Sequence, residues 1–486
     1  MFQSKTNTQE KINNNTYPFI NIFFAFLPIS FVFGSFFVNV HLLLFCCLGI
    51  FYLKSKILTT KFDFSIKIIF LFFLIILFST SLGFLKSLYF DGLETINTIP
   101  SCHGTNCFSP LVRLTKAILF FRFFLFLLIV YLLNKFSILN FKYFFLTSAL
   151  TAILISLDII YQYIFGFNIA GLKNEGFYNS GFFGDELIAG GFIQRFAFFA
   201  IFFTIFIFKN KNYTKFISTI IVICILGAGI LFSGSRMPLI LFILGFFVIL
   251  LSNFKIKKIL FLSLVALFVL LKFTISSNEK YEFYIENTYE SFARQAKNIL
   301  SITGLQKWKK SSRVKKESLQ SKTSFYTVEY EGLHRRIYLA AIETWKTNKI
   351  FGNGIKSFRQ DCWKLAKMPD VNLSEDLYPG KKNLLCSNHP HNYYLEILVE
   401  TGIVGFFIVL IIGLSFIVFI FKNFRSIKQI SIENSILLSV ITSLILETLP
   451  LRSTGSLFST NNAAYLVIIT SIFLCHKTLT KNNHWK

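Results

Sequence analysis

Apolar segments as long as a membrane-spanning helix follow one another along most of the chain, separated by short polar segments. A helix needs roughly 20 apolar residues to cross a bilayer, and these segments lack the alternation of apolar and polar residues that is typical of strands. The pattern predicts about twelve spans, near residues 18–36, 39–53, 67–85, 115–133, 143–165, 188–208, 216–233, 237–252, 257–275, 393–421, 433–449 and 460–476. The first residues are polar and no small-residue cleavage site follows the first span, so we expect no cleavable signal peptide.

The composition agrees with an all-α polytopic membrane protein. Of 486 residues, 54% are hydrophobic, 64 are Phe and only 15% are charged. A soluble domain has about a quarter charged residues, and disordered chains lack aromatic and aliphatic residues. These values therefore exclude an ordinary soluble enzyme and a disordered protein.

The formal net charge of +25 is distributed unevenly along the chain. Lys and Arg are frequent after every second span, as at Lys209, Lys211 and Lys215, whereas the short loops on the other side carry few. Cytoplasmic loops are rich in Lys and Arg. The pattern predicts a multi-pass membrane protein with both termini in the cytoplasm.

One long polar segment interrupts the series of spans, and it divides the chain into three parts. Residues 1–275 hold the first nine spans, residues 276–392 form a loop domain, and residues 393–486 hold the last three spans and a cytoplasmic tail. The topology places the loop domain on the non-cytoplasmic side. Long loops of this kind are usually functional, and we expect the catalytic residues here.

Arginines at the outer ends of spans are the first candidates for a binding site. Arg122, Arg195, Arg236 and Arg452 lie at this depth, where the charge pattern disfavours cations. Guanidinium groups match the geometry of phosphate, so the cluster suits an anionic lipid head group such as a diphosphate. Snorkelling side chains, structural ion pairs or a structurally bound phospholipid are the alternatives.

The motif Ser387-Asn388-His389-Pro390-His391-Asn392-Tyr393-Tyr394 leads into the tenth span. Proline suits the first turn of a helix, which would place His391 at a helix N-terminus. This position lowers a histidine pKa and keeps the imidazole neutral, so His391 is a candidate general base for a sugar hydroxyl. His389 is the second choice, and the alternative is that both histidines cap the helix or bond to the backbone. Motifs of metalloproteases, serine hydrolases and metal-dependent nucleotide-sugar enzymes are missing from the loop.

Four of the eight cysteines face the oxidising side in this topology: Cys102, Cys107, Cys362 and Cys386. Two disulfides are therefore expected. The alternative is a metal site at Cys102, His103 and Cys107, which has too few ligands.

Taken together, these motifs make the chain resemble the O-antigen ligase and O-antigen polymerase family of bacterial envelope proteins. The resemblance rests on Asn388 to Tyr393 with Leu395, Glu400 and Gly402, on His334-Arg335-Arg336 leading to Phe351-Gly352-Asn353-Gly354 and Phe358, and on Ser233-Gly234-Ser235-Arg236. Segments 181–189 and 453–456 are less specific matches. The family often has Trp where Tyr338 stands, which leaves the register of the loop arginines open by one residue.

The resemblance implies an inverting, metal-independent and cofactor-free glycosyl transfer on the periplasmic face. The donor would be a glycan on undecaprenyl diphosphate. The acceptor would be a lipid A core in a ligase, or another lipid-linked glycan in a polymerase. Membrane lipids are expected partners and nucleic acids are not.

Residue by residue, the resemblance gives three catalytic positions. Arg236 would bind the diphosphate, Arg335 would be the loop arginine and His391 would be the base. Arg336, His389, Arg195, Arg122, Asn392 and Arg452 would contribute to substrate binding. A Cys362–Cys386 disulfide would brace the loop before the histidine motif.

Four functions remain open from the sequence. We prefer a ligase over a polymerase, which shares its chemistry and differs in the acceptor. A transporter or flippase would be supported mainly by Asp158 inside the fifth span. A structural assembly protein with an inert loop is the fourth.

Overall fold

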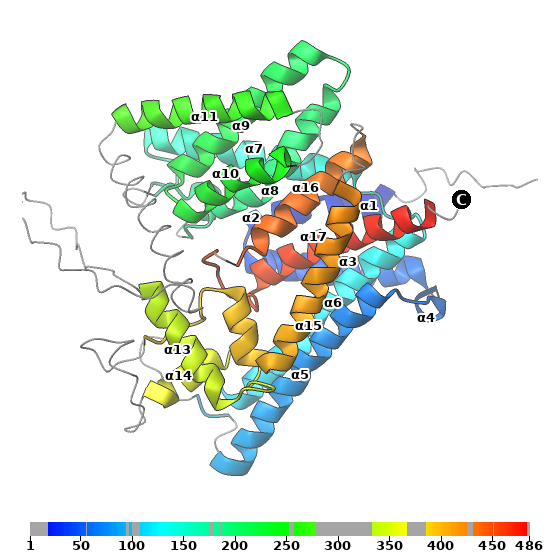
Figure 1. Ribbon diagram of the computed structural model, residues 1–486, viewed down its shortest axis with the longest axis vertical. Helices are drawn as coiled ribbons and strands as arrows, with labels where there is room; N and C mark the ends of the chain where they lie inside the picture. The colour runs from blue at the N-terminus through cyan, green and yellow to red at the C-terminus, as the bar shows by residue number, and fades with distance from the viewer. Residues whose placement is uncertain are drawn as a thin grey trace, which may run out of the picture.

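The computed structural model describes residues 18–54, 56–93, 97–99, 107–174, 178–184, 186–251, 257–277, 333–366, 385–424, 431–450 and 452–483. Within these residues the protein is all helical and has no β-strand. Figure 1 shows the helices along the chain. They are α1 (Pro18–Ala25), α2 (Leu27–Val32), α3 (Ser35–Leu53), α4 (Lys56–Thr59), α5 (Phe64–Asp91), α6 (Pro110–Lys135), α7 (Lys142–Phe165), the 3-10 turn η2 (Gly181–Phe183), α8 (Ala189–Ile207), α9 (Asn212–Phe232), α10 (Arg236–Leu250), α11 (Lys257–Ser277), α13 (Leu333–Thr347), α14 (Phe358–Ala366), α15 (Tyr393–Phe424), α16 (Ile432–Glu447) and α17 (Thr460–Asn483).

Every predicted span falls on a helix or, for the first span, on the helix pair α1 and α2. In the described residues, seven helices are long and apolar enough to cross a membrane: α3, α5, α6, α7, α8, α9 and α15. The segment Pro18–Val32, α10 and part of α17 are shorter apolar helices. The protein is therefore a multi-pass membrane protein, and the number of twelve spans stays a prediction.

Local signals in the sequence set several helix ends. Ser109 caps α6, because its hydroxyl accepts a hydrogen bond from the Val112 amide and Pro110 follows at the first helical position. Ser431 caps α16 in the same way, by accepting from the Asn434 amide. Gly166 ends α7 in the left-handed conformation that glycine adopts most easily. These ends could be expected from the residue types alone.

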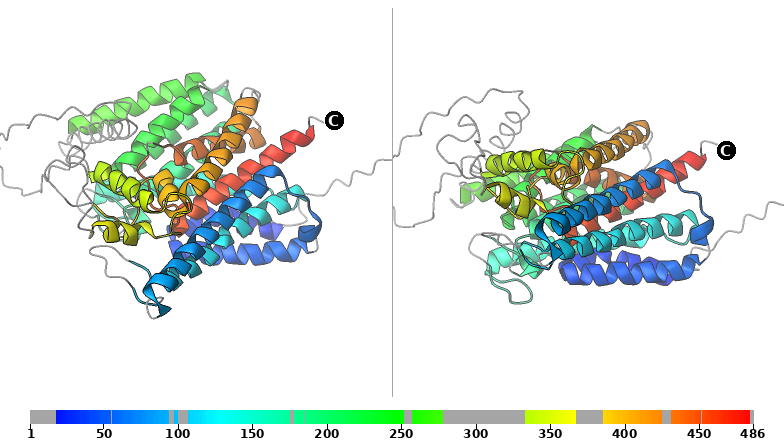
Figure 2. Two further views of the ribbon diagram at one scale, coloured as in Figure 1. Left: turned by 60° about the horizontal axis from the view of Figure 1, so that its bottom comes forward. Right: turned by 90° about the horizontal axis from the view of Figure 1, so that it is seen from below.

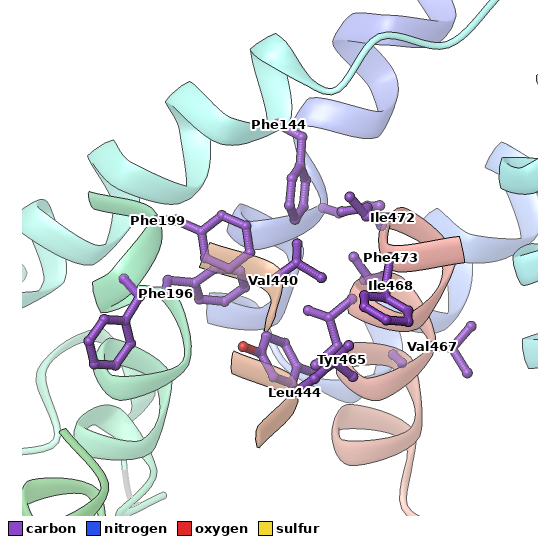
Figure 3. Packing of buried hydrophobic residues seen from close by; sticks show 14 of the residues in the cluster. Phe144, Phe196, Phe199, Val440, Leu444, Tyr465, Val467, Ile468, Ile472 and Phe473 are labelled. Carbon is purple, nitrogen blue, oxygen red and sulfur yellow. The ribbon is translucent and has the colours of Figure 1, made fainter. Parts of the chain in front are cut away.

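The core of the bundle lies where α7, α8, α16 and α17 meet. Figure 3 shows Phe144 beside Ile472, Phe199 on the side of Val440, and Tyr465 beside Leu444. These side chains are buried, and the rings of Phe144 and Phe199 are perpendicular with centroids 5.8 Å apart. Aromatic rings favour such edge-to-face contacts, which helps so many phenylalanines to pack in one core.

The helices α13 and α14 lie at one end of the bundle, and the C-terminal end of α17 lies at the other (Figure 2). The two helices share one small hydrophobic core with α15. It is formed by Ile337, Leu339, Ala340, Ala341, Phe358, Cys362, Leu365 and Val399. A disulfide between Cys362 and Cys386 links α14 to the segment that leads into the histidine motif, with the two Cα atoms 5.8 Å apart. The described part of the polar loop is thus docked firmly on α15.

A break in α15 makes this docking possible. Gly402 has a φ of 67°, which interrupts the helix and exposes backbone amides. The amide of Ile403 donates to the carbonyl of Lys349 at 2.9 Å, and the Glu400 carbonyl accepts from Gly354 at 2.8 Å. A Cβ atom on Gly402 would lie 2.1 Å from the Ile350 oxygen. The connection between α13 and α14 therefore fits into the break because residue 402 has no side chain.

Candidate active site

Glu447, at the end of α16, holds two arginines from different parts of the chain. Its carboxylate lies 2.8 Å from Nη2 of Arg195 in α8 and 2.6 Å from Nη1 of Arg452. The side chain of Glu447 is only 1% exposed, and those of Arg195 and Arg452 are 14% and 10% exposed. Tyr393 adds a hydrogen bond from its hydroxyl at 2.9 Å. One carboxylate thus faces two guanidinium groups, and the cluster has a net positive charge.

These two arginines line a cavity of about 490 Å³, together with Arg236. We refer to this space as the arginine cavity. Arg236 is the first residue of α10, and its neighbours Ser235, Met237 and Pro238 also line the cavity. The amides at a helix N-terminus attract anions. The structure therefore brings together three of the four arginines that the sequence places at the outer ends of spans.

The fourth, Arg122, lies elsewhere. It is not among the residues that line the arginine cavity. Its Nε donates to Asn39 at 3.1 Å, its Nη1 donates to the carbonyl of Leu119, and its guanidinium stacks over the ring of Phe123. These contacts give Arg122 a structural role within α3 and α6.

The start of α15 differs from the expected geometry. The helix begins at Tyr393, and Asn392 is its cap: the Asn392 side chain accepts from the amides of Tyr394 and Leu395 at 3.0 and 3.2 Å. Pro390 is therefore not in the first turn, and His391 precedes the cap with a φ of 55°. Asn392 is buried and donates to the carbonyl of Pro450, so its side chain is used for folding and is not open to a substrate.

The segment after α16 fixes the histidine motif in place. The amide of Thr454, which lines the arginine cavity, donates to the carbonyl of His391 at 2.9 Å. The imidazole of His391 is half-buried, with Nε2 3.3 Å from the hydroxyl of Ser387. Its ring centroid lies 4.2 Å from that of His389. The backbone of His391 is thus bonded directly to a residue that lines the arginine cavity.

His389 has a pKa lowered to about 3. Burial is the main cause, followed by the nearby charges of His391 and Lys356, and a hydrogen bond to the backbone of Thr454 opposes the shift only in part. An effective general base has a pKa near the pH at which it works. His389 is neutral at physiological pH and is too weakly basic for that role.

A second group of charged residues lies beside the histidines, and sequence reasoning did not give it a function. Glu396 and Glu400 are one turn apart on α15 and are both buried. The Lys356 amide donates to Glu400 at 2.7 Å, while its Nζ donates to Ser456, which itself donates to Glu396. The sequence did contain a signal for this group: Glu396 and Glu400 stand at the start of an apolar helix, and buried carboxylates require cations nearby.

Arg359 of α14 belongs to the same group. Its guanidinium is buried and lies 4.9 Å from the ring centroid of Phe108. Burial lowers its pKa, against the opposing influence of Glu400 and Glu396. An arginine stays charged under these conditions. Two cations and two carboxylates thus connect the docked loop to α15.

The loop arginines are only partly described. Arg335 and Arg336 lie in the first turns of α13. Arg336 is half-buried, whereas the Arg335 side chain lies outside the described part of the structure. The register question between these two arginines is therefore not tested.

Asp158, the main support for a transporter, holds a loop. It is buried in α7 and accepts a hydrogen bond from the Ile169 amide at 3.0 Å. Gln162, one turn later, accepts from the Gly181 amide at 2.8 Å and donates to the carbonyl of Leu172. Both side chains thus organise the segment between α7 and α8, and Asp158 no longer favours a transport pathway.

Of the other predicted cysteines, Cys107 is in a disulfide bond. Cys102 and His103 lie outside the described residues.

The fold and the site define a class: a multi-pass bacterial membrane protein with a cationic cavity and a histidine motif at the same end of the bundle as a docked polar loop. Residues 220–410 match the family model described as O-antigen ligase. This region thus carries the domain of the O-antigen ligase family, as the motifs predict, and the match supports an O-antigen ligase- or polymerase-type membrane enzyme. Such enzymes act on lipid-linked glycans. No curated protein matches the chain.

The matched region runs from α9 into α15. It includes Arg236, α13, α14 and the histidine motif. Arg195 and Arg452 lie outside it, although both line the same cavity as Arg236. Glu447, which holds the two arginines, also lies outside the matched region.

Proposed function

We propose that the protein is a ligase that transfers a glycan from undecaprenyl diphosphate to a lipid A core on the periplasmic face of the inner membrane, with inversion and without a metal. The observation that carries this proposal is the arginine cavity, which is lined by Thr454, whose amide donates a hydrogen bond to the carbonyl of His391. A polymerase would use the same cavity, and the difference lies in the acceptor.

The cavity suits the diphosphate of the donor. Its volume of about 490 Å³ lies within the range of about 300–1,000 Å³ for small-molecule sites. Arg195, Arg236 and Arg452 line it with the exposed Glu186, and the carboxylate of Glu447 pairs with Arg195 and Arg452. The site keeps a net positive charge, which favours an anionic group.

The reaction needs few catalytic groups because the diphosphate is already a good leaving group. The acceptor hydroxyl oxygen forms a bond to the anomeric carbon while the bond from that carbon to the diphosphate oxygen breaks. The electron pair stays on the diphosphate, where the arginines stabilise the growing charge. The hydroxyl proton passes to His391, and attack from the opposite face inverts the anomeric centre.

His391 is preferred to His389 as the base. The low pKa of His389 makes it a poor proton acceptor at physiological pH. The residue His391 is only half-buried, and its Nε2 lies 3.3 Å from the Ser387 hydroxyl. Arg335, with Arg336 as the alternative, would complete the cationic surroundings of the donor from α13.

The product of the purified enzyme tests the proposal. Full-length protein in nanodiscs is incubated with undecaprenyl-diphosphate-linked glycan and lipid A core, and the lipids are separated on a gel. A ligase yields core that carries the glycan. Longer lipid-linked glycan without modified core would identify a polymerase, and unchanged lipids would refute both.

His391→Gln tests the base. General base catalysis contributes about 10²- to 10⁴-fold, so we expect kcat to fall in that range while the melting temperature stays the same. Tyr394→Phe is the matched control, because it removes a hydroxyl that only bonds the Thr448 carbonyl. Full activity of His391→Gln would exclude His391 as the base.

A further inference from the structure

A second cavity lies on the other side of the docked loop. It has a volume of about 240 Å³ and lies between the outer end of α5, the first turn of α6 and the helices α13 and α14. None of its lining residues lines the arginine cavity. Its charged residues are Lys86, Arg113, Asp361 and Lys364.

Arg113 is the buried centre of this cavity. It is only 5% exposed. In the described structure its hydrogen bond is from Nη1 to the Asn353 carbonyl at 3.3 Å, and its buried Nε has no hydrogen-bond partner. A buried guanidinium with so few partners has capacity to bind an anion, since leaving a charged group unpaired is costly.

The two lysines extend the positive charge to the surface. Lys86 and Lys364 are exposed, and Nζ of Lys86 is anchored by Asn348 at 2.6 Å. The carboxylate of Asp361 accepts a hydrogen bond from Asn353 at 3.0 Å. Three cations and one carboxylate therefore leave two net positive charges.

The segment that separates the two cavities also carries the charged group beside the histidines. Asn353 lines the second cavity, and three residues later Lys356 contacts Ser456. Gly455, the residue before Ser456, lines the arginine cavity. A molecule in the second cavity is thus connected through this short segment to the site of transfer.

Size and charge limit the ligand. The volume is below the range of about 300–1,000 Å³ for drug-sized ligands, so a head group fits and a glycan chain does not. A phosphate monoester carries about −1.5 to −2 charges at neutral pH, which matches the two net positive charges. A phospholipid phosphodiester carries a single charge and would leave the cavity unbalanced.

We propose that this second cavity binds a phosphate monoester on a lipid-anchored sugar. The claim that this lipid is the acceptor rests on the proposed function. The claim that the cavity binds a phosphate monoester is independent of the proposed function.

Native mass spectrometry of the full-length protein in detergent tests the site. The probes are monophosphoryl lipid A, the same lipid after enzymatic removal of its phosphate, and phosphatidylglycerol. We expect the wild type to prefer the phosphorylated lipid. Each of Lys86→Ala and Lys364→Ala should weaken its binding about tenfold, the usual effect of one charge-assisted hydrogen bond. Lys349→Ala is the control, because Lys349 is exposed on the same connection but does not line the cavity.

Loss of the preference in the Lys86→Ala/Lys364→Ala double variant, with binding of the dephosphorylated lipid unchanged, would support the site. An unchanged preference in the double variant would overturn it. If the wild type binds phosphatidylglycerol as well as the phosphorylated lipid, and the double variant abolishes this binding, the cavity is a phospholipid site and the proposal of a phosphate monoester is wrong. If glycan transfer fails while lipid binding behaves as expected, the proposed function is wrong and the phosphate site remains.

Discussion

Replacing Glu447 by glutamine keeps the size of the side chain and removes the charge that holds Arg195 and Arg452. The carboxylate is 1% exposed and lies within 2.8 Å of both guanidinium groups. Glutamine would present an amide N–H, which cannot accept a hydrogen bond, to one of the two arginines. We expect the arginines to repel each other and the wall of the arginine cavity to open.

The magnitude follows from burial. Removing one partner of a buried ion pair typically costs about 3–5 kcal/mol, because the remaining charge is left uncompensated. Here one change leaves two arginines, with side chains 14% and 10% exposed. We therefore expect Glu447→Gln to lower the free energy of unfolding by at least about 3 kcal/mol and to abolish transfer.

Glu343→Gln provides the control. It also breaks an ion pair, to Lys346 at 2.7 Å, but this pair is on the surface with side chains 24% and 51% exposed. Such pairs contribute about 0–1 kcal/mol. Thermal melting and equilibrium unfolding in mixed micelles measure both variants. Equal, small effects of the two substitutions would refute the reasoning that Glu447 organises the cavity.

Three further variants test other parts of the site. Arg236→Ala should raise the donor KM about tenfold or more with unchanged melting, since charge-assisted hydrogen bonds contribute about 1.5–3 kcal/mol; an unchanged donor KM would remove Arg236 from the binding site. Gly402→Ala should destabilise the protein by more than the roughly 1–2 kcal/mol of a left-handed residue, because its Cβ would lie 2.1 Å from the Ile350 oxygen; wild-type melting would contradict this. His389 takes up a proton near pH 6.5 when unfolded and near pH 3 when folded, so between these values stability should fall with falling pH by up to about 1.4 kcal/mol per unit. Melting curves from pH 6.5 to 4.5 measure that slope, and a His389→Gln variant with the same slope would show that another group causes it.

Much of the fold could be predicted because each membrane-spanning helix is specified locally. A segment in lipid has to satisfy its own backbone groups, so apolar length alone locates a helix such as α15. The ends of helices were harder. Pro390 suggested an early start for α15, whereas Asn392 caps the helix and His391 adopts a positive φ. Cap and turn geometry depends on side-chain hydrogen bonds that residue types only favour.

The candidate site could be predicted in part. The sequence singled out Arg195, Arg236 and Arg452, because the predicted topology places them at outer ends of spans, where cations are unexpected. Whether they meet was not readable, because α8, α10 and the segment after α16 are far apart in the chain. Arg122 shows the difference, since its position has the same pattern but its partners are Asn39 and the Leu119 carbonyl.

The sequence by itself determined that this protein is an all-helical membrane protein with the motifs of the O-antigen ligase family, because apolar length and short motifs are local properties. Only the tertiary structure decided which charges lie together. Glu447 faces two arginines, Lys356 bridges to Ser456, and Arg113 lines a second cavity. Each of these arrangements joins residues from helices distant in the chain, and electrostatic energy depends on distance and burial rather than on sequence position.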